Sequence, residues 1–422
     1  MESSRRGKRR LVEDSRIEAQ MDGKKLIDTL TVRNLLSYGN ESPDVKLEPL
    51  NVLIGPNASG KSNIIEVLSL LRATPNDLTA PIRDGGGIKE WLWKGAKDTP
   101  TAEIGATVRY SEGAIPLRYR ISFTMADQRL ELVDEAIEDV GSNGSRSDAY
   151  FRYQQGNPIL NYRPLVEIDG GKQRRIPRRL WRGNLKSDQS VLSQRKDPDQ
   201  YPELTYLGVQ FANIRIFREW NVGRYTAPRL PQQPDSPKDF LLEDASNLGL
   251  VLRDLNQRGD TRKLILRRLQ QFYDNVEYIS TTIRGGMVQL FLHEKGLHQP
   301  TPATRLSDGT LRYLCLLSIL CHPDPPPVVC IEEPELGLHP DIILTLAELL
   351  VEAAQRTQLV VTTHSDTLVS ALTAIPETVL VCERDDRGSC LRRLEPECLR
   401  RWLEKYSLGD LWRMGELGGT RW

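Results

Sequence analysis

Cysteine is scarce in this sequence and follows no ligand pattern. The 422 residues hold six cysteines, all beyond residue 314 and mostly inside apolar runs, and no Cys-x-x-Cys pair occurs. This pattern argues against a disulfide framework and against a cysteine zinc site. Isolated cysteines of this kind act as small apolar side chains in a reducing compartment. We therefore expect a cytoplasmic protein.

Long apolar runs and an excess of charge of one sign are also lacking. No run approaches the roughly 18 residues that a membrane helix needs, and residues 1–20 lack the apolar core of a secretory signal. We therefore expect no membrane partner and no secretion. The chain has 57 Lys and Arg residues against 57 Asp and Glu residues. Zero net charge excludes a uniformly basic coat for nucleic acid, although a local basic patch remains compatible with it.

The length and the order of apolar patterns predict an α/β protein of several parts. At about 150 residues per domain, 422 residues correspond to two or three domains. A strand, a glycine-rich turn and a helix come first, then antiparallel strands and a long insert, then β-α-β units, which is the plan of an α/β nucleotide-binding protein. The predicted segments are a basic disordered tail (1–24), an N-terminal lobe (25–139), an insertion (140–240), a C-terminal lobe (241–395) and a C-terminal tail (396–422).

The strongest motif is the glycine-rich turn between a predicted strand that ends at Ile54 and a predicted helix over 60–72. It fits G-x-x-x-x-G-K-[ST] at every position, in the strand-to-helix context that a phosphate-binding loop requires. Glycines let the backbone wrap a phosphate, and the helix N-terminus supplies positive potential. The lysine can reach the β- and γ-phosphates of ATP, and the serine hydroxyl can bind Mg²⁺. The predicted ATP-binding residues are Gly55, Pro56, Asn57, Ala58, Ser59, Gly60, Lys61, Ser62 and Asn63.

A second motif is the apolar strand over 328–331, which ends in Glu332 and Glu333. A dry strand that ends in a carboxylate places the acid at a sheet edge, where it can bind the Mg²⁺ that accompanies phosphates. A buried strand with a solvated acidic turn is the alternative. Because a phosphate-binding loop stands in the same chain, we favour Glu332 and Ser62 as metal ligands.

Two further polar segments adjoin predicted elements. The segment 307–310 precedes a predicted helix, so its serine hydroxyl, its backbone and the helix N-terminus form a second anion-binding end, although an ordinary helix cap has the same composition. His364 follows the apolar strand 359–362, where its imidazole can hydrogen-bond a γ-phosphate or a water molecule. A lone histidine often has no special role, but this is one of only five in the chain. The residues of the first segment are Ser307, Asp308, Gly309 and Thr310.

These four motifs, in this order, resemble those of the ABC-type ATPases, and within that class the RecF/SMC-like branch. The resemblance rests on Gly-Pro-Asn-Ala-Ser-Gly-Lys-Ser-Asn at 55–63, Leu-Ser-Asp-Gly-Thr-Leu-Arg at 306–312 and Glu-Glu-Pro-Glu-Leu-Gly-Leu-His-Pro at 332–340. The chain is also similar to stand-alone bacterial AAA-type ATPases related to the OLD and RecF proteins, over about 25–125 and 240–395. The resemblance implies a P-loop NTPase fold with a mixed sheet and helices, an antiparallel β subdomain and an inserted, partly irregular or helical subdomain.

The resemblance also implies roles for individual residues. Glu332 would take the Walker B metal role, Glu333 would polarise the attacking water, and His364 would be the switch histidine. One phosphate-binding loop and one signature per chain imply that the segment 307–310 acts in trans on the ATP of a second subunit. A homodimer or higher oligomer would then form around ATP and Mg²⁺. The implied catalytic residues are Lys61, Glu333 and His364, and the implied metal ligands are Ser62 and Glu332.

The sequence departs from the ABC pattern at two points. Glu332 replaces the aspartate that is usual at this position, and its extra methylene alters the geometry toward Mg²⁺. The glutamine of the Q-loop has no identifiable position, because Gln154, Gln194 and Gln210 all lack a telling context. In addition, Tyr38 precedes the glycine loop and either stacks on adenine or belongs to the core.

A basic segment in the predicted insertion is the candidate nucleic-acid contact. Residues 172–186 hold seven cations, no acid and Trp181. Such a composition can follow a phosphate backbone and stack a base, or it can form only a solvated charged face. The cations are Lys172, Arg174, Arg175, Arg178, Arg179, Arg182 and Lys186.

Several hypotheses remain for what the ATPase serves. Residues 365–422 are too few for the Toprim nuclease domain of OLD proteins, so an effector would be a separate polypeptide. The first hypothesis is an ATP-gated switch in bacterial anti-phage defence that works with a separate nuclease or toxin. The alternative is a RecF-like DNA repair ATPase that binds DNA itself. A transporter subunit is disfavoured, because such subunits carry Ser-Gly-Gly-Gln and Asp-Glu where this chain has Ser-Asp-Gly-Thr and Glu-Glu. The segment 406–422 either docks a partner chain or folds back on its own subunit.

Overall fold

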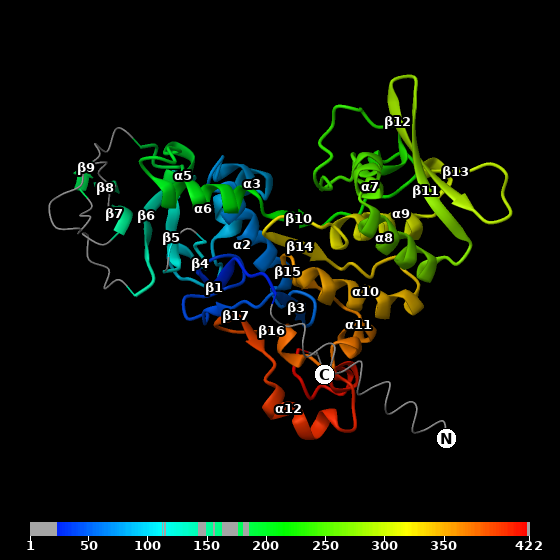
Figure 1. Ribbon diagram of the computed structural model, residues 1–422. Coiled ribbons are helices and arrows are strands. Elements are labelled where there is room, and N and C mark those ends of the chain that lie inside the picture. Colours follow the sequence, from blue (N-terminus) through cyan, green and yellow to red (C-terminus); the bar gives the residue numbers. More distant parts are fainter. Residues whose placement is uncertain are drawn as a thin grey trace, which may run out of the picture.

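The computed structural model describes residues 23–419 except 112, 114, 142–148, 155–156, 163–175 and 180–184. Most of the predicted tail over 1–24 lies outside these residues. The described part contains three β-sheets, with the six-stranded sheet between an eight-stranded and a three-stranded one (Figure 1). No helix within the described ranges is long and apolar enough to cross a membrane.

The central sheet brings the ends of the motif-bearing strands to one edge. Its order is β10-β14-β15-β3-β16-β17, and all neighbours pair in parallel except β16 and β17. Thr362 pairs with Leu53 on one side and with Glu332 on the other, so the carboxyl ends of three strands lie in register. Leu53 belongs to one apolar core, and Val52 and Ile54 belong to a second, because both faces of the sheet are covered. The strands are β3 (Leu50–Ile54), β10 (Arg215–Phe217), β14 (Val328–Glu332), β15 (Gln358–Thr362), β16 (Val379–Asp385) and β17 (Gly388–Arg393).

The helices next to this sheet begin close to where the sequence predicts them. The predicted helix over 60–72 is α2, and the helix that Pro340 opens is α10, in which proline occupies the first turn that suits its fixed φ. Ser307 caps α9, because its Oγ accepts a hydrogen bond from the Thr310 N–H at 3.1 Å. The helices are α2 (Lys61–Ala73), α9 (Asp308–Leu320), α10 (Pro340–Ala354) and α11 (Asp366–Ala371).

The eight-stranded sheet is antiparallel in the order β2-β1-β4-β5-β6-β7-β8-β9. Its strands alternate in the way expected of a sheet with one buried face: in β5, Leu117, Tyr119 and Ile121 are buried while Arg118 is exposed. The strands are β1 (Ile27–Arg33), β2 (Val45–Lys46), β4 (Ala102–Val108), β5 (Leu117–Ala126), β6 (Arg129–Asp139), β7 (Ala149–Gln154), β8 (Asn157–Tyr162) and β9 (Ile176–Arg179). Beside them lie α3 (Thr79–Asp84), α4 (Ile88–Trp91), α5 (Val191–Gln194) and α6 (Pro202–Ala212).

The three-stranded sheet lies at the upper right in Figure 1, next to α7 and α8. Its two long strands form a hairpin that continues into a short third strand. The elements are α7 (Leu248–Gln257), α8 (Gly259–Phe272), β11 (Val276–Arg284), β12 (Met287–Glu294) and β13 (Thr301–Pro302). Short 3₁₀ turns are η2 (Ala227–Arg229), η3 (Ala303–Arg305) and η4 (Pro376–Thr378).

Residues 140–240 contribute to both larger sheets. Strand β7 pairs with β6 across the predicted boundary at residue 139, and β10 pairs with β14 at the edge of the central sheet. The described residues of this predicted insertion are therefore tied to the elements on either side of it. The division of the chain into domains stays a prediction.

The C-terminal segment folds back on its own subunit, which decides between the two alternatives for its described residues. It forms α12 (Pro396–Leu403) and α13 (Leu408–Arg413), and α13 packs on α11. Leu408 and Leu411 are fully buried, and Arg413 pairs with Asp366 at 3.3 Å. Gly419 lies against the glycine loop, because a Cβ added to it would lie 3.3 Å from the Cα of Gly55.

Candidate nucleotide-binding site

The glycine loop between β3 and α2 is tightly enclosed by backbone and small side chains. Gly55 and Gly60 have φ angles of 146° and 111°, which side-chain-bearing residues rarely adopt. A Cβ on Gly55 would lie 2.3 Å from the carbonyl oxygen of Cys382, and a Cβ on Gly60 would lie 2.4 Å from the Oγ of Ser389. Only glycine fits at either position, so the loop keeps a backbone surface that a phosphate can approach closely.

A layer of hydrogen bonds from distant elements supports the loop. The Tyr38 hydroxyl donates to the Gly60 carbonyl at 3.0 Å, and the Ser389 hydroxyl donates to the Ser59 carbonyl at 2.5 Å. Asn63 donates through Nδ2 to the Ser37 hydroxyl at 2.6 Å. Tyr38 is 1% exposed, and burial raises the pKa of its hydroxyl well above the usual value. It is therefore a core residue that holds the loop, and not a ring that stacks on adenine.

The Lys61 ammonium lies over its own loop. Its Nζ donates to the carbonyl oxygens of Gly55 at 2.8 Å and Pro56 at 3.0 Å. Burial lowers the pKa of Lys61, while the carboxylate of Glu333 opposes this shift. The Lys61 ammonium is partly dehydrated, and both of its acceptors are neutral carbonyl oxygens. Because hydrogen bonds to charged phosphate oxygens are stronger, a phosphate can replace these carbonyls as acceptor.

The two glutamates at the end of β14, Glu332 within the strand and Glu333 directly after it, have different surroundings. Burial raises the pKa of Glu332, the positive charge of Arg218 lowers it, and the negative charge of Glu66 raises it. Glu333 has a φ of 45°, a strained value for a residue other than glycine, and its N–H donates to the Thr362 carbonyl at 3.0 Å. The strand β15 thereby fixes the backbone of Glu333 beside His364.

His364 lies next to Glu333 and is positioned by a third glutamate. Its Nε2 lies 3.6 Å from the Glu333 Oε1, and its backbone N–H donates to the Glu335 Oε1 at 3.0 Å. The Thr363 hydroxyl donates to the same oxygen at 2.6 Å. Burial is the main cause that lowers the pKa of His364, and the charge of Lys61 lowers it further. The imidazole is therefore neutral near pH 7 and can both donate and accept a hydrogen bond.

The segment 307–310 contacts the loop that follows Glu333 in the same chain. A Cβ on Gly309 would lie 2.9 Å from the Gly337 carbonyl oxygen, and Arg312 donates to the Leu336 carbonyl. Asp308 forms an ion pair with Arg229, a residue for which the sequence offers no motif. The serine hydroxyl serves as the helix cap, and its action on a second subunit stays a prediction.

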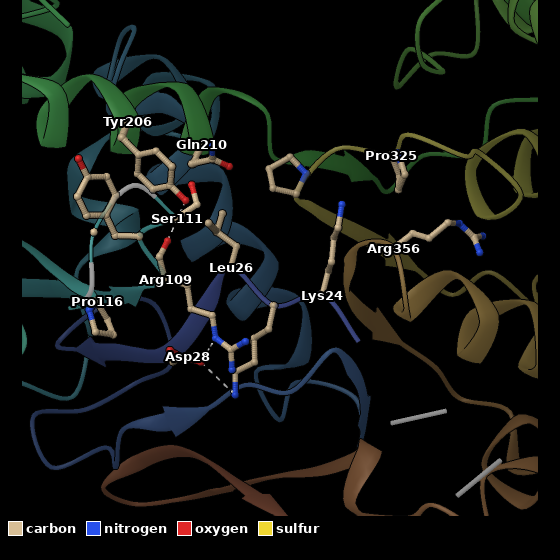
Figure 2. A pocket seen from close by; sticks show the side chains of 14 residues that line it. Lys24, Leu26, Asp28, Arg109, Ser111, Pro116, Tyr206, Gln210, Pro325 and Arg356 are labelled. Carbon is tan, nitrogen blue, oxygen red and sulfur yellow. Dashed lines mark hydrogen bonds and ion pairs between the residues drawn. The ribbon is translucent and has the colours of Figure 1, made fainter. Parts of the chain in front are cut away.

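The candidate Q-loop glutamines and the described part of the basic segment belong to elements outside the central sheet. Lys172, Arg174, Arg175 and Arg182 fall outside the described residues, and Arg178 and Arg179 belong to β9 at the edge of the antiparallel sheet. Gln154 lies in β7 of the antiparallel sheet, and Gln194 hydrogen-bonds to the Lys186 backbone. Gln210 lines a pocket of about 860 Å³ at the amino ends of β14 and β15 (Figure 2). Two cations of this pocket already have partners: Arg109 pairs with Asp28 at 3.2 Å, and Arg356 donates to backbone carbonyls.

The oxygen donors near the loop suit Mg²⁺. Ser62 offers a hydroxyl at the start of α2, and Glu332 offers a carboxylate at the end of β14; Mg²⁺ prefers such hard oxygen ligands and keeps positions for phosphate and water. No group of three or more His, Cys, Asp or Glu side chains in the described ranges could hold a metal ion alone.

The fold and this arrangement define a P-loop ATPase of the AAA/SMC-head type. The chain belongs to the family described as "AAA domain, putative AbiEii toxin, Type IV TA system", which matches residues 50–370. The fold resembles an SMC head bound to the C-winged helix domain of ScpA, at 14% identity and a TM-score of 0.54, covering 89% of this chain and 100% of that one. It also resembles the Smc head with an extended coiled coil bound to the C-terminal domain of ScpA derived from Pyrococcus furiosus, at 14% identity and a TM-score of 0.52, covering 90% and 98%. No curated protein matches the chain.

These matches confirm two predictions made from the motifs. The fold class is that of a P-loop NTPase with mixed sheets, and the resemblance to the RecF/SMC-like branch of ABC-type ATPases holds for the chain. At 14% sequence identity, the two solved structures are evidence for the fold alone.

Proposed function

We propose that this protein binds Mg·ATP, dimerises around it and hydrolyses it, and that it works in the cytoplasm as a nucleotide-gated switch of anti-phage defence with a separate effector. The observation that carries the proposal is the edge of the central sheet, where the Glu333 Oε1 lies 3.6 Å from the His364 Nε2 and the Lys61 ammonium lies over the glycine loop that follows the adjacent strand β3. A loop for phosphate, a carboxylate for water and a neutral imidazole together suit phosphoryl transfer to water.

Each side chain has a defined task in this reaction. Lys61 leaves its two carbonyl acceptors and binds the β- and γ-phosphate oxygens. Glu333 accepts a hydrogen bond from the attacking water and orients it in line with the γ-phosphate. His364 donates a hydrogen bond to the γ-phosphate or to that water. Ser62 and Glu332 would hold Mg²⁺, which supplies charge neutralisation of the phosphate oxygens when it is bound.

The proposed dimer follows from what one chain exposes. The chain has one glycine loop and one segment 307–310, and the capped N-terminus of α9 is open to solvent at Ser307. Leu336 and Leu344, in the loop and helix that follow Glu333, are 50% and 54% exposed. Exposed apolar side chains next to an anion-binding helix end support a second subunit that brings its own ATP there.

A separate protein partner is proposed from three sources. The family description names a putative toxin and a toxin–antitoxin system. Both solved SMC heads are bound to a domain of another polypeptide, ScpA. The anti-phage role rests on the resemblance to OLD-related ATPases in the sequence motifs.

Light scattering on the Glu333→Gln variant tests the proposal. This variant should bind ATP without turnover, so its mass should double with Mg·ATP and remain that of the monomer without it. Glu397→Gln, which changes an exposed glutamate on α12, is the matched control and should hydrolyse ATP like the native protein. A Glu333→Gln protein that turns over ATP at the native rate would place the water-activating residue elsewhere. If the variant stays a monomer at all ATP concentrations, the proposed ATP-dependent dimer is refuted.

The same measurement with a short DNA duplex addresses the alternative of a RecF-like DNA repair ATPase. That alternative rests on the basic composition of residues 172–186. An ATP-dependent dimer that takes up DNA with a steep salt dependence would favour it, and a dimer indifferent to DNA would favour the switch with a separate effector.

A further inference from the structure

Arg218 lies between the helix of the glycine loop and the acidic end of β14. Phe217 pairs with Ile331, so Arg218 follows β10 beside Glu332. Its Nη1 donates to the Glu66 Oε1 at 2.5 Å, and its Nε lies 3.7 Å from the Glu332 Oε1. Glu66 stands one helical turn after Ser62 on α2. The guanidinium therefore borders the place where Ser62 and Glu332 would hold Mg²⁺.

The Arg218 guanidinium has N–H donors that make no hydrogen bond to the described residues. Its Nε and Nη2 are buried atoms without a hydrogen-bond partner among the described residues. A guanidinium carries five N–H donors in a planar fork, which matches the oxygen atoms of a phosphate. Arg218 also lines a hollow of about 740 Å³ with Glu66 and Arg72, so there is room beside the side chain.

The segment that carries Arg218 is held firmly against β14. The Trp220 indole donates through Nε1 to the Glu332 carbonyl at 3.1 Å, and the Phe217 ring stacks on it with centroids 5.9 Å apart. The guanidinium of Arg312 also lies over the Trp220 ring, 5.5 Å from the ring centroid. The backbone of Arg218 is thus preorganised, which lowers the conformational entropy that the segment loses when a ligand binds.

We propose that Arg218 binds the terminal phosphate of ATP, and that it leaves the Glu332 carboxylate to Mg²⁺ when the nucleotide enters. The inference rests on the proposed nucleotide-binding function and deepens it. Three carboxylates, those of Glu66, Glu332 and Glu333, lie near the place proposed for the γ-phosphate. Because they repel the negative charge of the phosphate, a cation held in a fixed position beside it stabilises binding. ADP has no such phosphate, so Arg218 would make the site prefer ATP over ADP.

Calorimetric titration with Mg·AMP-PNP and Mg·ADP tests the proposal without relying on turnover. Arg218→Ala should weaken the affinity for Mg·AMP-PNP by on the order of ten- to a hundredfold, the usual effect of losing hydrogen bonds to a charged group. Its affinity for Mg·ADP should change far less. Arg218→Lys keeps the charge but loses the fork, and should fall between the native protein and Arg218→Ala.

Arg215→Ala is the matched control. It removes a cation from β10, the strand that precedes Arg218, and from the same hollow, and within the described part of the chain its guanidinium donates to the Ala212 carbonyl at 3.4 Å and to no carboxylate. Thermal melting and circular dichroism verify that each variant is folded. If Arg218→Ala does not fold, Arg218→Gln retains an amide donor at the position and is compared in the same titrations.

Equal losses for both nucleotides, or a loss that Arg215→Ala reproduces, would overturn the inference and indicate a structural role for Arg218. Unchanged affinity for Mg·AMP-PNP in a folded variant would overturn it as well, while the proposed function would stand. A native protein that binds neither nucleotide would refute the proposed function itself, and the inference with it.

Discussion

Replacing Arg229 by methionine is expected to lower the free energy of unfolding by about 3 kcal/mol. Arg229 is 6% exposed and donates to the carbonyl oxygens of Val222 at 2.8 Å, Ala303 at 3.2 Å and Leu306 at 2.6 Å. Each of these three acceptors would lose a hydrogen bond, at about 1 kcal/mol per bond, and the Ala303 carbonyl would keep the one it accepts from the Leu306 N–H. The ion pair with Asp308 adds little, because the carboxylate is 69% exposed and water screens it.

Urea unfolding followed by circular dichroism measures this difference. Asp308→Asn removes only the ion pair and should cost no more than about 1 kcal/mol. Arg229→Lys keeps the positive charge but lacks the planar guanidinium that reaches three carbonyls at once. Its free energy of unfolding should therefore be closer to that of Arg229→Met than to that of the native protein. If Asp308→Asn were as costly as Arg229→Met, the stabilisation would come from the ion pair, and the account based on backbone carbonyls would be refuted.

Three further outcomes are expected. Lys61→Ala should weaken ATP binding by on the order of a hundredfold or more in calorimetry, because it removes the cation that faces the phosphates, and retained native affinity would refute the loop assignment. Ser307→Arg should leave nucleotide binding by the monomer intact and abolish the ATP-dependent dimer in light scattering; an unaffected dimer would remove the role in trans. Burial raises the pKa of Glu135 to about 7, so the folded protein binds more protons than the unfolded chain between about pH 5 and 7 and should lose stability as the pH rises through that window. Glu135→Gln should flatten this decline in urea unfolding measured from pH 5 to 8, and an unchanged pH profile would assign the decline to another group.

The elements that bear the motifs could be predicted because each depends on adjacent residues. A glycine loop between a strand and a helix, and an apolar run that ends in two acids, are local patterns with a definite period. The register of β14, β15 and β3 then brings Glu332 and His364 to the same edge, as expected for the carboxyl ends of parallel strands.

The supporting residues could not be predicted because they come from distant parts of the chain. Ser389 hydrogen-bonds to the glycine loop from a hairpin more than 300 residues further on, and Tyr38 does so from the loop after β1. Nothing in the local sequence distinguishes such residues from others with the same side chains. For Tyr38 the sequence left two interpretations open, and only its burial decided between them.

The segment 215–229 shows most clearly why a functional site can include residues outside its motifs. Its strand β10 has three residues, too few for any period to be visible, and the sequence around it is rich in proline and polar residues. Yet Trp220 donates to the carbonyl of Glu332, the proposed metal ligand, and Arg229 donates to the Leu306 carbonyl before α9, so one short segment is hydrogen-bonded to both halves of the proposed ATP site.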